Sequence, residues 1–169
     1  MAEERRPRVY LIGTGGSISF VGRERTDYIN YSYDNKHLTI HELLDRVPEV
    51  SRWAEVRAEQ FLNVGSTDVG PSHWLALAKR INAIFREDPE AAGVAITHGT
   101  ATLEETAYFL HLTVKSRKPV VITGAMRPPT SLGTDADLNL LDAVRIAACP
   151  DAAGKGVLTV LNNEIQSAR

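Results

Sequence analysis

The chain has 169 residues, of which 43% are hydrophobic and 24% charged, and its formal net charge is −2. This length and composition are typical of a single globular domain with a proper core, so residues 1–169 are treated as one domain. The near-neutral charge argues against nucleic acid as a partner, and no apolar run approaches the roughly 18–20 residues of a membrane span.

Short apolar runs alternate with segments of helical periodicity along the chain. In order, we predict a strand at 9–12, a helix at 38–44, a strand at 56–64, a helix at 71–85, a strand at 93–97, a helix at 102–114, a strand at 119–123, a helix at 137–148 and a strand at 157–161. This alternation predicts a mainly parallel sheet with right-handed crossovers. The expected fold class is therefore α/β, a three-layer sandwich of the doubly wound, flavodoxin-like kind.

Three local features refine this prediction. The polar stretch 19–36 indicates a long loop or an irregular hairpin, and long loops in compact domains often form active-site lids. Capping boxes are expected at two helix starts, from Thr39 with Glu42 and from Thr102 with Glu105. The chain stops soon after its last predicted strand, so we expect that strand to lack a partner and more protein, or another subunit, to cover it.

Glycine and hydroxyl residues gather where the predicted strands end, at 13–17, 65–68, 98–100 and 124–128. Ligands of such sheets bind at the carboxyl ends of the strands. Several hydroxyls and backbone amides in one crevice favour acyl transfer over phosphate binding. Glycine N–H groups can stabilise an oxyanion, and Ser17 offers a nucleophile beside them.

Other interpretations of these residues stay open. The first glycine cluster can be a turn without chemistry, although a dinucleotide fingerprint is disfavoured because Ile18 stands at the third glycine position. Thr100 and Thr102 can be simple helix caps, and His98 a satisfied residue at a strand end. No spacing of His, Cys or acidic residues resembles a metal site, and no cofactor is expected.

Taken together, the motifs resemble one family. TGGSI at 14–18 resembles the first signature of bacterial-type L-asparaginases and glutaminase-asparaginases, and ITHGT at 96–100 with EETAYFL at 104–110 resembles the second. VGS at 64–66, GAMRP at 124–128 and LNNEI at 161–165 are similar to further blocks of the family. The resemblance runs from about residue 8 to the end and implies the amino-terminal domain of such an amidohydrolase, without the family's smaller carboxy-terminal domain.

The resemblance implies hydrolysis of L-asparagine to L-aspartate and ammonia through a hydroxyl nucleophile and an acyl-enzyme. It implies catalytic roles for the hydroxyl residues Ser17 and Thr100 and for an activating tyrosine. Three tyrosines compete for that third role, and Tyr28 is preferred over Tyr31 and Tyr33. It also implies that substrate is bound by Gly16, Ser66, Thr67, Gly99 and Ala125.

Three departures from the family pattern leave alternatives open. Ala101 replaces an aspartate that binds the substrate's ammonium group, Thr67 replaces a glutamine, and the chain ends at Arg169, just short of the family's catalytic lysine. The alternatives are a non-catalytic amino-acid-binding or regulatory domain, and an amidohydrolase for an amide that lacks the α-ammonium group.

The resemblance implies a small-molecule amide, asparagine and possibly glutamine, as the partner, and a homo-oligomer. The charged start lacks the apolar stretch of a signal peptide, and the single Cys149 cannot form an internal disulfide. Both observations favour a cytoplasmic location.

Overall fold

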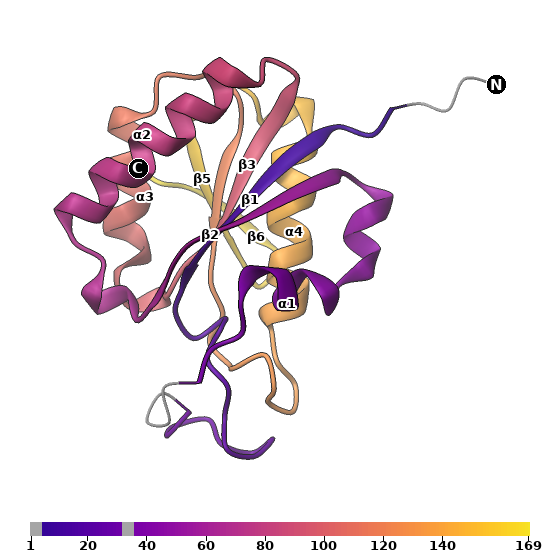
Figure 1. Cartoon of the computed structure of the whole chain (residues 1–169), viewed down its shortest axis with the longest axis vertical. Coiled ribbons are helices and arrows are strands. Elements are labelled where there is room, and N and C mark those ends of the chain that lie inside the picture. The colour runs from indigo at the N-terminus through magenta and orange to yellow at the C-terminus, as the bar shows by residue number, and fades with distance from the viewer. Residues whose placement is uncertain (1–4, 32–35) are drawn as a thin grey trace.

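The computed structural model describes residues 5–31 and 36–169, which form a twisted sheet with helices on both faces (Figure 1). Within these residues six strands pair in the order β2-β1-β3-β4-β5-β6. The first five run parallel and β6 is antiparallel to β5. The strands are β1 Arg8–Gly15, β2 Glu55–Val64, β3 Ala91–Thr97, β4 Val120–Thr123, β5 Val157–Leu161 and β6 Glu164–Ser167. The helices are α1 Ile40–Asp45, α2 Pro71–Glu87, α3 Leu103–Thr113 and α4 Ala136–Ala148.

Apolar side chains project from both faces of the central strands. On one face Val9 and Leu11 of β1 join a buried cluster with α1 and α4. On the other face Ile12 of β1 joins a second cluster with α2 and α3. The strands are buried on both sides, which explains why they are near-continuous apolar runs in the sequence. The predicted three-layer α/β sandwich is confirmed.

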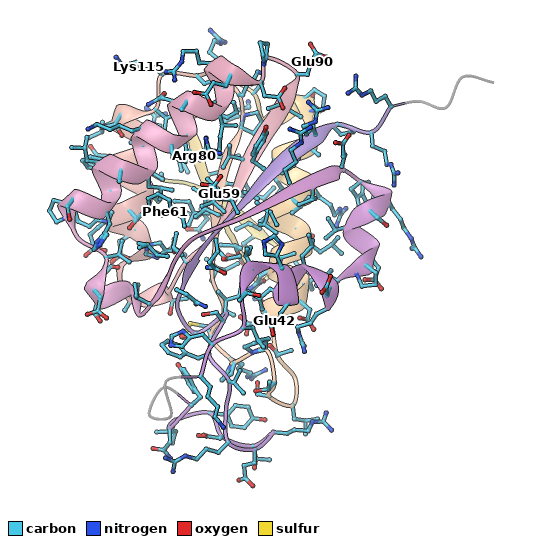
Figure 2. The ribbon with its side chains drawn as sticks, in the orientation of Figure 1. Glu42, Glu59, Phe61, Arg80, Glu90 and Lys115 are labelled. Carbon is cyan, nitrogen blue, oxygen red and sulfur yellow. The ribbon has the colours of Figure 1, made fainter. Side chains whose placement is uncertain are left out.

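The edge strand β2 is held to α2 by charge as well as by apolar packing. Arg80 of α2 donates from Nε and Nη2 to the carboxylate of Glu59, at distances of 2.6 to 2.9 Å. Figure 2 shows these two side chains lying together beside β2, with Phe61 further along the same strand. Phe61 packs against the α2–α3 cluster. The ion pair and this apolar contact thus tie the edge strand β2 to α2.

Two local predictions were wrong. Thr102 does not cap α3 with its side chain, because its hydroxyl donates instead to the carbonyl of Ser66, 2.8 Å away. The strand at 157–161 is not unpaired, because β6 pairs with it through a turn at Asn162 and Asn163, whose φ angles are 51° and 63°. Consecutive residues with positive φ form the tight hairpin turns that favour asparagine.

Other local predictions are confirmed. Thr39 and Glu42 form a capping box at the start of α1. At the described ends of the polar stretch after β1, Phe20 and His37 form an antiparallel bridge, which agrees with the expected irregular hairpin. None of the helices in the described part of the chain is long and apolar enough to cross a membrane.

Candidate active site

The turn after β1 lies directly against the backbones that follow β2 and β3. Gly15 and Gly16 have φ angles of 105° and 87°. A Cβ atom on Gly15 would lie 2.3 Å from the carbonyl oxygen of Val64, and one on Gly16 would lie 2.1 Å from Cα of Gly99. Only glycine combines positive φ with so close an approach. The two glycines therefore fix where the next residue, Ser17, leaves the sheet.

The ends of β2, β3 and β4 meet at the same place. A Cβ atom on Gly99 would lie 2.7 Å from Oγ of Ser66, and one on Gly124 would lie 2.9 Å from Cγ2 of Thr100. The buried hydroxyl of Thr14 donates to the carbonyl of residue 97, 2.8 Å away, and so ties β1 to β3. The four strand ends that carry the sequence motifs thus converge at one edge of the sheet.

Ser17 has a hydroxyl partner from the long loop. Its Oγ lies 3.1 Å from the hydroxyl oxygen of Tyr31, and either atom can be the donor. The ring of Tyr31 lies 6.0 Å from the ring of Phe20, at the stem of the loop. The pair is partly buried. The two hydroxyls thus lie within the hydrogen-bond distance that proton transfer between them requires.

The other two candidate tyrosines are placed differently. Tyr28 is 43% exposed, and its hydroxyl donates to the carbonyl of Leu132, 2.9 Å away. Tyr33 lies outside the described residues. The geometry therefore favours Tyr31 as the partner of Ser17, while the catalytic assignment of Tyr28 stays a prediction.

His98 is a structural residue of the β3 turn. Its side chain is fully buried, with Nδ1 2.8 Å from the carbonyl oxygen of Gly99 and Nε2 3.0 Å from the hydroxyl of Thr106 on α3. Burial lowers the pKa of His98, against smaller opposing effects of the Gly99 carbonyl and Glu105. A neutral ring that donates from Nδ1 and accepts at Nε2 satisfies both contacts. His98 thus holds the turn that presents Thr100.

Ala125 directly follows Gly124, the residue after β4 that approaches Thr100. It is fully buried and packs with Ile18 and Ala136 in a small apolar cluster. Ile18 directly follows the candidate nucleophile, so this cluster fixes the β1 turn against the start of α4.

Two residues that the sequence analysis did not assign shape the loop after β4. Asp135 accepts hydrogen bonds from the backbone N–H groups of residues 126 and 127, each 2.9 Å long. Asn139 donates to the carbonyl of Gly124 and accepts from the backbone N–H of Asn162. Asp135 directly precedes α4, a position where an acidic residue commonly caps a helix, and that signal could have drawn attention to it.

The rim of the site carries short side chains. Thr67 is exposed in the turn Ser66–Asp68, and Ala101 is exposed in the turn Thr100–Thr102. The hydrogen bond from Thr102 to the carbonyl of Ser66 joins the two turns. Within residues 5–31 and 36–169 no group of three or more His, Cys, Asp or Glu residues is placed to hold a metal ion.

Comparison with known proteins identifies the family. Residues 8–169 match the family model described as asparaginase, N-terminal. The chain is 47% identical to L-asparaginase 2 of Bacillus subtilis, with 96% of the chain and 43% of that protein aligned. It is 42% identical to L-asparaginase 2 of Escherichia coli, with 96% of the chain and 45% of that protein aligned. It is also 42% identical to a glutaminase-asparaginase of Pseudomonas fluorescens, with 95% of the chain and 44% of that protein aligned.

A solved structure agrees with these relatives. The probable cytoplasmic L-asparaginase of Campylobacter jejuni superposes with a TM-score of 0.89 at 40% identity, over 98% of the chain and 48% of that protein. The chain thus spans about half the length of the relatives that it matches. It belongs to the asparaginase family and corresponds to the family's amino-terminal domain.

Proposed function

We propose that this chain carries the nucleophile of an amidohydrolase that converts L-asparagine to L-aspartate and ammonia. The observation that carries the proposal is the Ser17 hydroxyl, 3.1 Å from that of Tyr31, at the point where four strand ends converge. The family membership supports the same reaction, because the relatives are named L-asparaginases and glutaminase-asparaginases.

The proposed reaction has two steps. Ser17 Oγ attacks the carbon of the side-chain amide while its proton passes to the hydroxyl oxygen of Tyr31, which gives its own proton to the amide nitrogen. The C–N bond breaks, the nitrogen takes up that proton and leaves as ammonia, and an ester remains on Ser17. Water then cleaves the ester, which releases the carboxylate and restores the serine hydroxyl. Thr100 contributes a second hydroxyl at the start of the turn before α3.

The proposal assigns substrate contacts to the surrounding turns. Ser66 offers a hydroxyl for the substrate's carboxylate, and Gly16, Gly99 and Ala125 offer backbone atoms. Thr67 completes the rim. A cytoplasmic location and a homo-oligomer belong to the same proposal; they rest on the sequence and the family resemblance alone.

Ammonia release from L-asparagine tests the proposal. We expect Ser17→Ala to lower turnover at least about 10³-fold, because the covalent step loses its nucleophile. The exposed Ser72→Ala on α2 is the matched control and should retain the activity of the starting protein. Equal ammonia release by the starting protein and Ser17→Ala contradicts the proposal. Asparagine binding by calorimetry without turnover would instead favour a non-catalytic binding domain.

The uncharged side chains around the site favour a second candidate substrate, an amide without an α-ammonium group. Thr67 and Ala101 carry no charge, so neither can form an ion pair with a substrate ammonium group. The loss of a charge-assisted hydrogen bond costs roughly 1.5–3 kcal/mol, which corresponds to a ten- to hundredfold weaker interaction. An amide without an α-ammonium group avoids that loss. Comparison of kcat/KM for asparagine and for succinamic acid tests this candidate, and a preference for asparagine contradicts it.

A further inference from the structure

A hollow separate from the convergent strand ends lies between the long loop after β1 and the loop that joins β4 to α4. Its volume is about 600 Å³. Arg25 lines it from the first loop and Arg46 from the end of α1, while Thr130, Ser131 and Thr134 line it from the second loop. Figure 1 shows the two loops side by side below the sheet.

Arg46 is held in place. Its Nε and Nη2 donate to the two carboxylate oxygens of Asp137, at 2.9 and 2.8 Å, and Nη2 also donates to the carbonyl of residue 129, 2.8 Å away. Its Nη1 makes no hydrogen bond to the described residues. This bidentate anchoring leaves one edge of a pre-oriented guanidinium open towards the hollow.

Arg25 lines the same hollow from the loop after β1. Its backbone is fixed, because its carbonyl accepts from the N–H of Leu132, 2.8 Å away, and the nearby N–H of Gly22 donates to Thr130 over 3.1 Å. Its guanidinium makes no hydrogen bond or ion pair within the described part of the chain. Two cationic groups thus line one hollow, and Asp137 balances only one of them.

The neighbouring carboxylates do not supply the missing charge. Glu24 accepts from the hydroxyl of Thr26, 2.8 Å away. Asp27 accepts from the backbone N–H groups of Asn30 and Ile29, and these hydrogen bonds lower its pKa. Both side chains line a different hollow with Tyr28. Among the described residues, no acidic side chain lines the hollow itself, and of the two arginines only Arg46 has a carboxylate partner.

We propose that the hollow between Arg25 and Arg46 binds a phosphate group. The planar forks of two guanidinium groups match the oxygens of a phosphate, and the adjacent threonine and serine hydroxyls provide further polar contacts. A hollow of this size lies in the range of small-molecule sites, so it has room for free phosphate or for a small molecule that carries one. The bound anion joins the loop that presents Tyr31 to the loop after β4.

Calorimetric titration with inorganic phosphate, at an ionic strength matched with chloride, tests the site. We expect saturable binding that Arg25→Gln weakens about tenfold, because one charge-assisted contact is lost. Arg25→Lys should restore part of the affinity. Arg25 is the better target than Arg46, which also holds Asp137 and the loop after β4.

Arg52→Gln is the matched control. Arg52 is exposed and does not line the hollow, so its substitution removes the same charge at another place. It should bind phosphate like the starting protein. The proposal is overturned by phosphate that binds no better than chloride, and equally by Arg25→Gln with unchanged affinity. Tighter binding of glycerol phosphate than of inorganic phosphate would identify a phosphorylated small molecule as the ligand, and equal affinity would identify free phosphate.

Hydrogen exchange tests the link between the loops. Phosphate should slow exchange across residues 20–31 in the starting protein and leave it unchanged in Arg25→Gln. Unchanged exchange in both proteins overturns the link. These measurements need no substrate, so their failure is distinguishable from a failure of the proposed amidohydrolase activity.

Discussion

The turn after β1 and the turn after β3 each present a candidate hydroxyl, but the two hydroxyls are positioned by different parts of the protein. Thr100 follows a turn that is held within the core, because the buried His98 contacts both Gly99 and α3. Ser17 follows a turn whose glycines are locked against β2 and β3, while its hydroxyl partner comes from a long loop outside the core.

This difference separates two requirements of the site. The position of each hydroxyl residue is set by the close contact between the strand ends, and this contact depends on folding of the whole sheet. The chemical environment of Ser17 depends in addition on the loop that carries Tyr31. Changes in the glycine contact should therefore affect stability, and changes in the loop should affect activity alone.

The largest effect is expected at the contact shared by both turns. In Gly16→Ala the new Cβ atom would lie 2.1 Å from Cα of Gly99, at a φ angle of 87°. Neither backbone can move without displacing a strand end, so we expect the free energy of unfolding to fall by about 3 kcal/mol or more. Urea denaturation measures this loss.

Gly65→Ala provides the matched control. Gly65 has a φ angle of −63°, and a Cβ atom there would lie 3.8 Å from its nearest neighbours. We expect a change within about 0.5 kcal/mol, because this conformation suits any L residue. Similar losses in the two variants would mean that the contact between the first and third strand ends does not limit stability.

A smaller effect is expected from the loop. Tyr31→Phe should lower asparagine turnover about a hundredfold, because the hydroxyl 3.1 Å from Ser17 is removed while the ring contact with Phe20 is kept. The free energy of unfolding should stay almost unchanged. Tyr28→Phe removes a hydroxyl that bonds to Leu132 instead, and it should cost much less activity. A larger loss in Tyr28→Phe than in Tyr31→Phe would restore the assignment made from the sequence.

The same contrast explains what could be predicted from the sequence. The strand ends were predictable, because buried parallel strands are continuous apolar runs and their carboxyl ends meet at one edge. The choice among three tyrosines was not predictable, because the course of the loop depends on contacts with residues about 100 positions away, such as Leu132 with Arg25. Local rules also failed at Thr102, where the carbonyl of Ser66, 36 positions earlier, competes with the helix start for the hydroxyl.

The smallest effect is the pH dependence of the β3 turn. Burial lowers the pKa of His98, so the folded protein keeps this ring neutral where the unfolded chain, with an ordinary pKa of about 6.5, takes up a proton. Above that pH neither state binds the proton, and the contribution of the neutral ring to stability is fully present. Below it the free energy of unfolding falls, by at most about 1.4 kcal/mol per pH unit for one proton, until the pKa of the folded state is reached.

Urea denaturation at pH 7.5, 6.5 and 5.5 measures this slope, and His98→Gln should reduce it. His41→Gln, on the exposed surface of α1, is the control and should keep the slope of the starting protein. Burial also lowers the pKa of His37, and this residue contributes with the same sign in all three proteins. An unchanged slope in His98→Gln would mean that the ring takes up its proton inside the fold. The β3 turn would then tolerate a charge between Gly99 and α3, and the contrast between a turn held by the core and a turn completed by a loop would no longer hold.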